Sequence, residues 1–265
     1  MISVSDKTGI VELAKELCGR NIEIVSTGGS ASILRDAGFR VTEVSKLTGF
    51  PEMMDGRLKT LHPNVHGGLL ADRDENSHLN AMEKYNVKEI DLLVVNLYPF
   101  AETVRAGADY AQCIENIDIG GPAMIRAAAK NFKYVATLVD IQDYEGLVNE
   151  LKMNNGCTSY SFRQKLSQNA FSLTAYYDAM VSNWMLDNIT GVKPRRFSIS
   201  AALSQDLRYG ENPHQSASFF LDEYLQGGIG ASNQIQGKKL SHNNINDTDA
   251  ALELVNEFPQ NDGAA

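Results

Sequence analysis

Short β-branched runs alternate with segments of helical spacing along the first half of the sequence. Apolar residues recur at helical spacing over 10–17, between β-branched runs at 2–4 and 22–25. A short helical segment at 31–37 and further runs at 41–44, 92–96 and 134–139 continue the pattern. Strands that alternate with helices form mostly parallel sheets. The sequence therefore predicts an α/β fold with a doubly wound, mostly parallel sheet, in which ligands bind beyond the carboxyl ends of the strands.

The composition is that of a globular protein with a sizeable core. The chain has 265 residues, 43% of them hydrophobic, and a formal net charge of −9. The acidic surplus argues against a nucleic-acid coat, because such proteins usually carry a basic surface on the scale of a domain. No apolar run approaches the ~18 residues of a membrane helix, and Asp6 and Lys7 interrupt the place of a signal peptide. We therefore expect no nucleic-acid partner, no membrane partner and no export.

Neither cysteines nor histidines indicate a metal site. The three cysteines lie far apart in the sequence, at Cys18, Cys113 and Cys157. Their odd number and wide spacing fit neither a disulfide framework nor a cysteine zinc site. His62 and His66 would resemble a metal-binding pair on a helix, but Pro63 between them argues against an uninterrupted helix. We expect a cytoplasmic protein that binds no metal.

The pattern changes at three later places. Residues 45–73 contain Gly, Pro and His in a stretch too irregular for a simple connection, and such loops are usually functional or disordered. An apolar stripe from Phe162 to Trp184 predicts a long helix for packing or dimer contact. The segment 191–198 has Gly, Pro and basic residues without an apolar period, as linkers do. We therefore predict a domain over 1–190, this linker, and a small element over 199–265 with a helix at 247–258.

Two loops that follow predicted strands have the composition of a phosphate cradle. The first is Ser5-Asp6-Lys7-Thr8-Gly9, and the second is Ser26-Thr27-Gly28-Gly29-Ser30. Backbone N–H groups at a helix start bind anions, and successive glycines let the backbone approach a ligand. Serine, threonine or aspartate before a helix is more often a plain N-cap. Two such loops on neighbouring strand ends nevertheless favour one phosphate site.

A third candidate segment is basic. Arg57 and Lys59 are two residues apart, so an extended backbone would point both cations to one side and Thr60 to the other. A solvated basic surface is the alternative interpretation of this pair.

Polar residues also lie at the end of one predicted strand and at the start of one predicted helix. Asn96 and Tyr98 follow a strongly apolar strand and are positioned to face a ligand, although a tyrosine there is as often a core residue that exposes its hydroxyl. Asp118 precedes a helix that Pro122 would begin and Asn131 would end. Asp118 either caps that helix or binds ligand.

Six motifs in one order resemble a known family: SDKTG, STGGS, TGFPEMMDGRLKTLHP, NLYPF, IDIGGPAMIRAAAKN and RYGENPHQ. Over essentially the whole chain, the set resembles the bifunctional purine-biosynthesis family that joins IMP cyclohydrolase to AICAR transformylase. The cyclohydrolase part of that family is similar in fold to methylglyoxal synthase, in agreement with the doubly wound sheet predicted above. The resemblance implies a cyclohydrolase domain followed by only the start of a transformylase domain.

The resemblance also implies a reaction, in which 5-formamidoimidazole-4-carboxamide ribonucleotide closes its ring to IMP with loss of water. The carboxamide nitrogen attacks the formyl carbon, and a tetrahedral intermediate then expels hydroxide. The catalyst must remove an amide proton, stabilise an oxyanion and protonate a leaving oxygen. This chemistry requires no metal or redox cofactor, and the expected partner is the nucleotide itself.

Individual roles follow from the same resemblance. The phosphate would be held by seven residues of the two loops: Ser5, Asp6, Lys7, Thr27, Gly28, Gly29 and Ser30. The rest of the substrate would be contacted by Arg57, Thr60, Asn96 and Ile119. The chemistry would use Lys59 and Tyr98 at the formyl oxygen, Asp118 at the carboxamide, and Lys130 as proton donor and acceptor. A straight helix that begins near Pro122 would carry Lys130 about 12 Å along its axis from Asp118. Three arrangements are compatible with this distance: the substrate bridges the gap, the helix is broken, or Lys130 supports the site without touching the substrate.

The segment RYGENPHQ begins the transformylase site in that family. The resemblance places Arg208, Tyr209 and His214 near the aminoimidazole nucleotide. The chain stops before the Lys-His motif and most of the folate-binding region of the family. We therefore predict that this chain has no AICAR formyltransferase activity, the step for which the full-length family uses 10-formyltetrahydrofolate.

Two other functions stay open at the level of sequence. Methylglyoxal synthase shares the fold and the phosphate loops, but it needs a carboxylate base beside a triose phosphate and has no place for the KTLHP and NLYPF segments. A nucleotide-sensing module, similar to the allosteric domain of carbamoyl-phosphate synthetase, is the other function. The additional polar loops favour an enzyme. The resemblance also implies a homodimer, with much of the dimer contact in the transformylase region.

Overall fold

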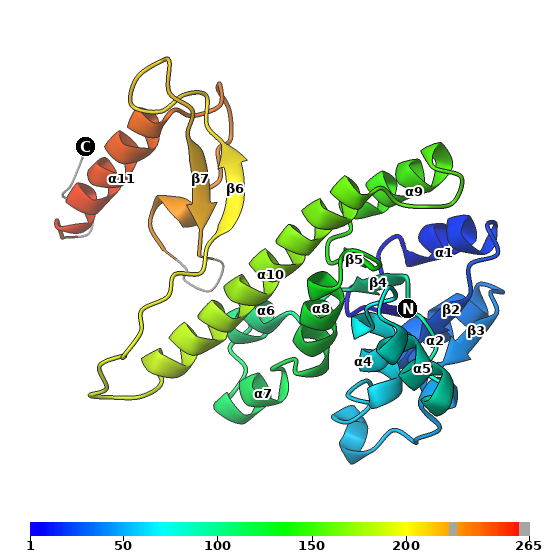
Figure 1. Cartoon of the computed structure of the whole chain (residues 1–265). Helices are drawn as coiled ribbons and strands as arrows, with labels where there is room; N and C mark the ends of the chain where they lie inside the picture. Colours follow the sequence, from blue (N-terminus) through cyan, green and yellow to red (C-terminus); the bar gives the residue numbers. More distant parts are fainter. Residues whose placement is uncertain (223–226, 260–265) are drawn as a thin grey trace. The chain divides into compact units, whose positions relative to one another are not determined.

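The computed structural model describes residues 1–222 and 227–259, which divide into two compact units. The first unit comprises Met1–Thr103 and Asp109–Ala175, and the second comprises Val104–Ala108 and the described residues from Tyr176 onward. Helix α10 (Tyr160–Asp187), the long green helix in Figure 1, contributes residues to both units. It agrees with the long helix predicted from the apolar stripe. The linker predicted at 191–198 lies within the second unit and stays a prediction as a domain boundary.

A parallel sheet forms the centre of the first unit. Within the described residues it has five strands, in the order β3-β2-β1-β4-β5, and all neighbouring pairs are parallel. The strands are β1 (Ile2–Ser3), β2 (Ile24–Ser26), β3 (Val41–Glu43), β4 (Leu92–Val95) and β5 (Ala136–Leu138). The strand order reverses between β1 and β4, as in doubly wound folds. The predicted fold class is therefore confirmed.

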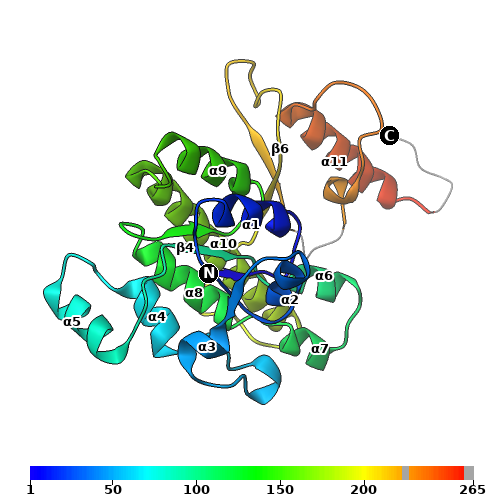
Figure 2. The ribbon, with the colours of Figure 1, turned by 90° about the vertical axis from the view of Figure 1, so that its right-hand side faces the viewer.

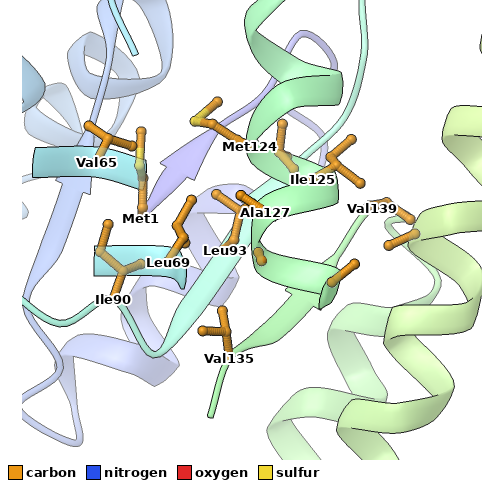
Figure 3. Packing of buried hydrophobic residues seen from close by; sticks show 14 of the residues in the cluster. Met1, Val65, Leu69, Ile90, Leu93, Met124, Ile125, Ala127, Val135 and Val139 are labelled. Atoms are coloured by element: carbon orange, nitrogen blue, oxygen red, sulfur yellow. The ribbon is translucent and has the colours of Figure 1, made fainter. Parts of the chain in front are cut away.

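Helices cover both faces of this sheet. On one face, α1 (Ile10–Cys18), α2 (Gly28–Asp36) and α9 (Asp143–Met153) pack against Val94 and its neighbours. On the other face, α4 (Pro63–Leu70) and α8 (Gly120–Lys130) pack against Leu93 and Val95. Figure 2 shows α1 above β4 and α4 and α8 below it, and Figure 3 shows the second cluster from close by. Successive residues of β4 point to opposite faces, which is why the strand is apolar throughout.

The structure corrects the expectation of an irregular stretch at 45–73. The stretch contains α3 (Val44–Thr48), a 3-10 turn η1 (Met54–Gly56) and α4. Pro63 is the first residue of α4, where a missing N–H costs nothing, so no uninterrupted helix carries both His62 and His66, as expected. His62 is the N-cap of α4, and its Nδ1 accepts a hydrogen bond from the Asn64 N–H at 3.1 Å.

Four other helices were not predicted: α5 (Asn76–Tyr85), α6 (Phe100–Arg105), α7 (Tyr110–Glu115) and α9. The helix expected to begin at Pro122 is α8, and it begins two residues earlier at Gly120.

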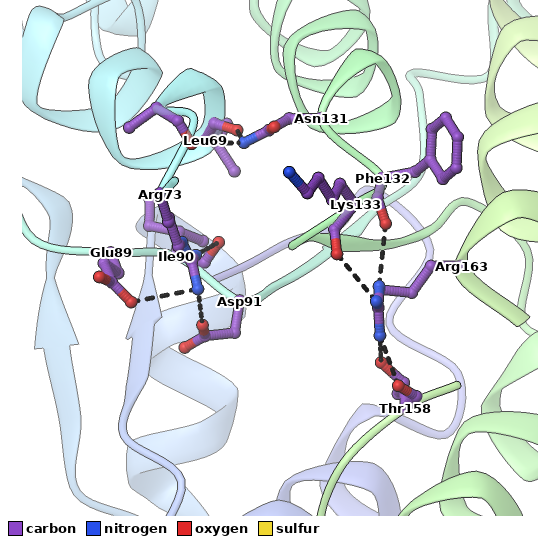
Figure 4. A network of polar contacts seen from close by, with 11 residues as sticks. Leu69, Arg73, Glu89, Ile90, Asp91, Asn131, Phe132, Lys133, Thr158 and Arg163 are labelled. Atoms are coloured by element: carbon purple, nitrogen blue, oxygen red, sulfur yellow. Dashed lines mark hydrogen bonds and ion pairs between the residues drawn. The ribbon is translucent and has the colours of Figure 1, made fainter. Parts of the chain in front are cut away.

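Polar contacts tie together the loops that precede β4 and β5 (Figure 4). Arg73 forms ion pairs with Asp91 at 2.6 Å and with Glu89 at 3.1 Å. Arg163 donates from Nε to the carbonyl of Phe132 at 2.9 Å. These contacts lie at the amino ends of β4 and β5. The polar loops that follow the strands lie at the opposite edge of the sheet.

The second unit contains a hairpin and a helix. Strand β6 (Ala202–Asp206) pairs with β7 (Ser218–Leu221) in antiparallel fashion, a 3-10 turn η2 covers Ile229–Ala231, and α11 covers His242–Asn256. Helix α11 confirms the predicted C-terminal helix but begins five residues earlier, at a Ser241 capping box. Residues 223–226 and 260–265 of the predicted C-terminal element lie outside the described residues. In the described part of the chain, no helix has the length and apolarity that crossing a membrane requires.

Candidate active site

A cavity of about 580 Å³ lies where the strand order reverses, at the carboxyl ends of β1 and β4. Five segments line it: the loops after β1, β2 and β4, the segment 52–60, and the chain that leads from α7 into α8. Open α/β sheets bind ligands at this kind of position. The volume suits a small molecule, since ligand pockets usually measure about 300–1,000 Å³.

Asn96 fixes the loop after β1 from the end of β4. Its Oδ1 accepts hydrogen bonds from the backbone N–H of Ser5 at 2.6 Å and of Asp6 at 3.0 Å, and its Nδ2 donates to the Asp6 carbonyl at 2.9 Å. Lys7 donates to the Ser5 carbonyl at 2.9 Å and lines the cavity. Asp6 is exposed and accepts hydrogen bonds from Thr8, which lower its pKa. Among the described residues, Asp6 is therefore not part of the cavity lining, whereas Ser5, Lys7 and Asn96 are.

The loop after β2 brings the start of α2 to the same cavity. Gly28, the first residue of α2, has φ +44°, and a Cβ atom there would lie 2.9 Å from the Lys59 Nζ. A Cβ atom on Gly29 would lie 3.3 Å from the Lys7 Cε. Two cations therefore lie against this helix start, and in the described chain Thr27 makes no side-chain capping bond with the α2 backbone. The two loops predicted to form one phosphate cradle line one cavity.

Hydroxyl groups join these loops beneath the cradle. The Ser3 and Thr27 hydroxyls lie 3.0 Å apart, and both residues line the cavity. The Ser30 hydroxyl donates to the Val4 carbonyl at 3.0 Å and accepts from the Val4 N–H at 3.2 Å. Since both Ser30 contacts are to backbone groups, Ser30 holds the second loop against β1.

The basic segment differs in geometry from the sequence expectation. Arg57 follows a turn and has helical φ and ψ angles of −61° and −30°, so the expectation of an extended backbone that turns Thr60 away was wrong. Thr60 is buried and lines the cavity together with both cations. Lys59 forms an ion pair with Glu52 at 3.1 Å, and the Arg57 Nε donates to Glu115 at 3.2 Å.

Tyr98 and Asp118 face the same cavity. Burial raises the pKa of Asp118, while hydrogen bonds from the backbone N–H groups of Gly121, at 2.8 Å, and of Tyr98 oppose the shift. The pKa of Tyr98 is raised as well, first by burial and then by the negative charges of Asp118 and Glu52. Asp118 therefore both binds the start of α8 and borders the cavity, so the two alternatives predicted for it do not exclude each other.

The start of α8 is a second helix amino end at the cavity. Ile119 and Gly120 line it, as predicted for Ile119. A Cβ atom on Gly121 would lie 2.6 Å from the Asp118 Oδ2, so glycine is needed for this close approach. Two positive helix ends and three cationic side chains therefore border the cavity, together with three carboxylates.

Besides Asp6, four predicted residues lie outside the cavity lining. Lys130 is the last residue of α8 and is exposed, and among the described residues it is not one that lines the cavity. Arg208, Tyr209 and His214 lie in the loop between β6 and β7, where the Arg208 guanidinium lies 4.9 Å from the centroid of the Tyr209 ring. The roles that the resemblance gives these four residues stay predictions.

Three polar residues of the lining were missed by sequence reasoning: Ser3, Glu52 and Glu115. Ser3 could have been found, because it ends the first strand beside the first loop. Glu52 and Glu115 had no local signal, since their cationic partners are brought to them by a turn and by a contact between distant segments. Within residues 1–222 and 227–259, no group of three His, Cys, Asp or Glu residues could hold a metal ion.

Two family models match the chain. The AICARFT/IMPCHase bienzyme model matches residues 128–265, and the MGS-like domain model matches residues 9–123. The bifunctional purine biosynthesis protein PurH of Dinoroseobacter shibae is 60% identical and that of Ruegeria pomeroyi 58% identical, each over the whole of this chain. This chain spans about half the length of these curated relatives, 50% in both cases.

The fold has a solved relative as well. The crystal structure of ForH superposes with a TM-score of 0.60 at 35% sequence identity, covering 70% of this chain and 98% of the ForH chain. Together with the parallel sheet and the cavity at its switch point, the bienzyme model, which matches more than half of the residues, establishes that this chain belongs to the AICARFT/IMPCHase bienzyme family.

Proposed function

We propose that the first unit is an IMP cyclohydrolase, which closes the ring of 5-formamidoimidazole-4-carboxamide ribonucleotide to IMP with loss of water. One observation carries the proposal: two phosphate loops share a cavity with Lys59, Tyr98 and Asp118, at the switch point of the sheet. Membership of the bienzyme family and the PurH relatives support the same activity.

The cradle suits the phosphate of a nucleotide. The N–H groups at the start of α2 carry partial positive charge, and the Lys7 ammonium lies beside Gly29. Because Asn96 already fixes the Ser5–Gly9 loop, little ordering is left for the moment of binding. The phosphate binds here and directs the base of the nucleotide toward Lys59, Tyr98 and Asp118.

The three residues supply the steps that ring closure needs. Asp118 accepts the proton of the carboxamide N–H as the nitrogen attacks the formyl carbon, and its raised pKa makes it a stronger base than an exposed aspartate. The raised pKa of Tyr98 keeps its phenol protonated, so that the phenol and the Lys59 ammonium donate hydrogen bonds to the oxyanion. The oxyanion takes back the proton held by Asp118, and the resulting hydroxyl leaves as water with a second proton, which the formamido N–H gives up as the ring C=N bond forms. This chemistry needs proton transfer and oxyanion stabilisation, so we propose no cofactor for it.

The test is a spectrophotometric assay of IMP formation by the purified chain. We expect Lys59→Ala and Asp118→Ala to lower kcat by about 100-fold or more, with a much smaller change in KM. Lys152→Ala, which removes an exposed lysine of α9, is the matched control and should retain activity. A wild-type chain that forms no IMP, or that instead releases methylglyoxal from a triose phosphate, would contradict the proposal.

We further propose a cytoplasmic homodimer. Support for the compartment comes from the three cysteines, which all lie in the described residues and form no disulfide there. Support for the dimer comes from the family resemblance of the sequence. Sedimentation at two concentrations and fractionation of cells test the two statements separately.

A further inference from the structure

Glu52 belongs to the cavity, yet the roles described above leave it without a function. Its two carboxylate oxygens lie 3.2 Å and 3.1 Å from the Lys59 Nζ. The two side chains are partly exposed, with 48% of Glu52 and 26% of Lys59 accessible to solvent. A surface ion pair of this kind usually adds little to stability, so its position in the cavity is the more informative property.

The Lys59 ammonium lies close to two other sources of positive charge. It is next to Gly28 at the amino end of α2, which carries partial positive charge, and a second ammonium, that of Lys7, lies beside Gly29. A cation is disfavoured at a helix amino end, and a second cation nearby adds to the repulsion. A lysine side chain also has several freely rotating bonds through which its charge could move away. Something must therefore hold this ammonium in place.

The backbone around Glu52 is shaped to leave room for its carboxylate. Met53 pairs with Leu58 across a tight turn, and Gly56 in that turn has φ +91°. A Cβ atom on Gly56 would lie 2.6 Å from the Glu52 Oε1. The turn thus brings Glu52 to Lys59 across seven residues, and any residue larger than glycine at position 56 would displace the carboxylate.

The carboxylate also faces the reacting part of the cavity. After burial and Asp118, Glu52 is the third cause of the raised pKa of Tyr98. Its charge is therefore felt at the phenol that, in the proposed reaction, shares the oxyanion with Lys59.

We propose that Glu52 is a positioning residue of this site, which fixes the place of the Lys59 ammonium in the cavity. The expected effect on turnover rests on the proposed cyclohydrolase function. The expected effect on the position of Lys59 does not. Glu52 does not contact the reacting atoms in this scheme and acts through Lys59.

Turnover of Glu52→Gln is the first test. The substitution keeps size and hydrogen bonding but removes the charge, so kcat should fall at least about tenfold with little change in KM. Glu52→Asp keeps the charge and should recover most of the loss. The matched control is Glu16→Gln, which removes the carboxylate that pairs with Arg20 at 2.8 Å near the end of α1, outside the cavity lining. This variant should stay within about twofold of wild type.

A double-mutant cycle with Lys59→Ala separates action through Lys59 from direct action on the substrate. If Glu52 acts through Lys59, Glu52→Gln should change kcat by less than about twofold once Lys59 is absent. Full loss on top of Lys59→Ala, or wild-type kcat in Glu52→Gln alone, would overturn the inference.

A crystal structure of Glu52→Gln provides a readout that needs no turnover. The Lys59 Nζ should leave Gly28, and an ammonium that keeps its place there would overturn the inference even if Lys59→Ala is too slow to measure. If the wild-type chain forms no IMP, the proposed function fails, while the position of Lys59 in this variant still decides the role of Glu52.

Discussion

Asp118 lies two residues before α8 and has a carboxylate that is partly removed from water. Burial raises its pKa above the ordinary value of 3.8, so the folded chain binds this proton more tightly than the unfolded chain. The stability that the protonated group contributes is complete below the ordinary pKa and is lost as the pH rises through the raised one. At neutral pH the ionised Asp118 therefore costs stability, as groups tuned for catalysis often do.

We expect Asp118→Asn to separate these two effects. The amide oxygen can still accept the Gly121 N–H, and the variant cannot ionise, so it should be more stable than wild type at neutral pH while kcat falls by about 100-fold or more. Denaturant unfolding should show a stability difference that grows as the pH rises from the ordinary pKa of 3.8 through the raised pKa. A variant that loses stability across this range would contradict the raised pKa.

Gly28 allows a second prediction about single residues. Gly28→Ala places a side chain at φ +44° and about 2.9 Å from the Lys59 Nζ, so it should lose roughly 1 kcal/mol of stability and also weaken substrate binding. Gly38→Ala, at φ +88° beyond the other end of α2, has the same backbone strain with nothing within 4 Å of the new atom. Equal effects of both variants on KM would show that Gly28 has no role at the cavity.

The sequence identified most residues of the cavity because their loops follow strands. Glycines, hydroxyls and a lysine after a strand are a local pattern, and Lys7, Gly28 and Asn96 were found from it. Glu52 was not found, because a turn that depends on Gly56 brings it to Lys59. The direction of Thr60 was wrong for a related reason, since the segment before it turns and is not extended.

Helix α4 packs closely on the segment before β4, and Gly68 makes this possible. A Cβ atom on Gly68 would lie 2.4 Å from the Lys88 carbonyl oxygen, and the Gly68 carbonyl accepts the Ile90 N–H at 3.2 Å. Gly68→Ala should therefore lower the free energy of unfolding by about 1–3 kcal/mol, because a backbone atom must move.

The matched control lies one residue earlier in the same helix. A Cβ atom on Gly67 meets the Val87 Cγ1 at 3.1 Å, and this side chain can yield. Alanine is favoured over glycine within helices by about 0.5–1 kcal/mol, so Gly67→Ala should be neutral or slightly stabilising in the same denaturation experiment. Equal destabilisation by both variants would contradict the close approach described for Gly68.

Helices and strands with a clear pattern of apolar residues were predicted from the sequence, and those without such a pattern were not. The five strands follow from β-branched runs and helices α1, α2 and α10 from helical spacing, while α8 was expected from Pro122 and Asn131 at its ends. Helix α4 was missed because residues 45–73 were expected to be irregular, although a proline at position 63 suits the first position of a helix. Its apolar residues Val65 and Leu69 are four apart, too few to reveal a helix of eight residues beside two glycines.

The first unit and the described residues after 188 differ in how much buried apolar surface they contain. In the first unit, Leu93, Ile125 and Leu138 are fully buried, whereas after residue 188 the buried positions are Ser200, Gly210 and Ser241. A two-stranded hairpin with so little buried apolar surface is marginal on its own. We expect backbone amides of β6 and β7 to exchange with solvent at least about 100-fold faster than those of β4 and β5, as measured by hydrogen exchange with mass spectrometry. Equal protection of both pairs would contradict this difference.

At the scale of the molecule, the order of six motifs was more informative than any physical pattern. Periodicity alone predicted the doubly wound sheet, and the motifs added the family, which the bienzyme model confirms. Where one unit ends and the next begins did not follow from composition, because α10 continues through the division without a break in its helical spacing.

The hydrogen bond from the Ser5 N–H to the Asn96 side chain joins residues that lie 91 positions apart in the sequence. During synthesis the ribosome releases the Ser5–Gly9 loop long before Asn96 exists, and the loop acquires its final shape only when β4 adds beside β1. A nascent chain that ends before this asparagine lacks the amide that shapes its own first loop. Binding of the nucleotide by ribosome-arrested chains of increasing length would therefore show at which chain length β4 pairs with β1.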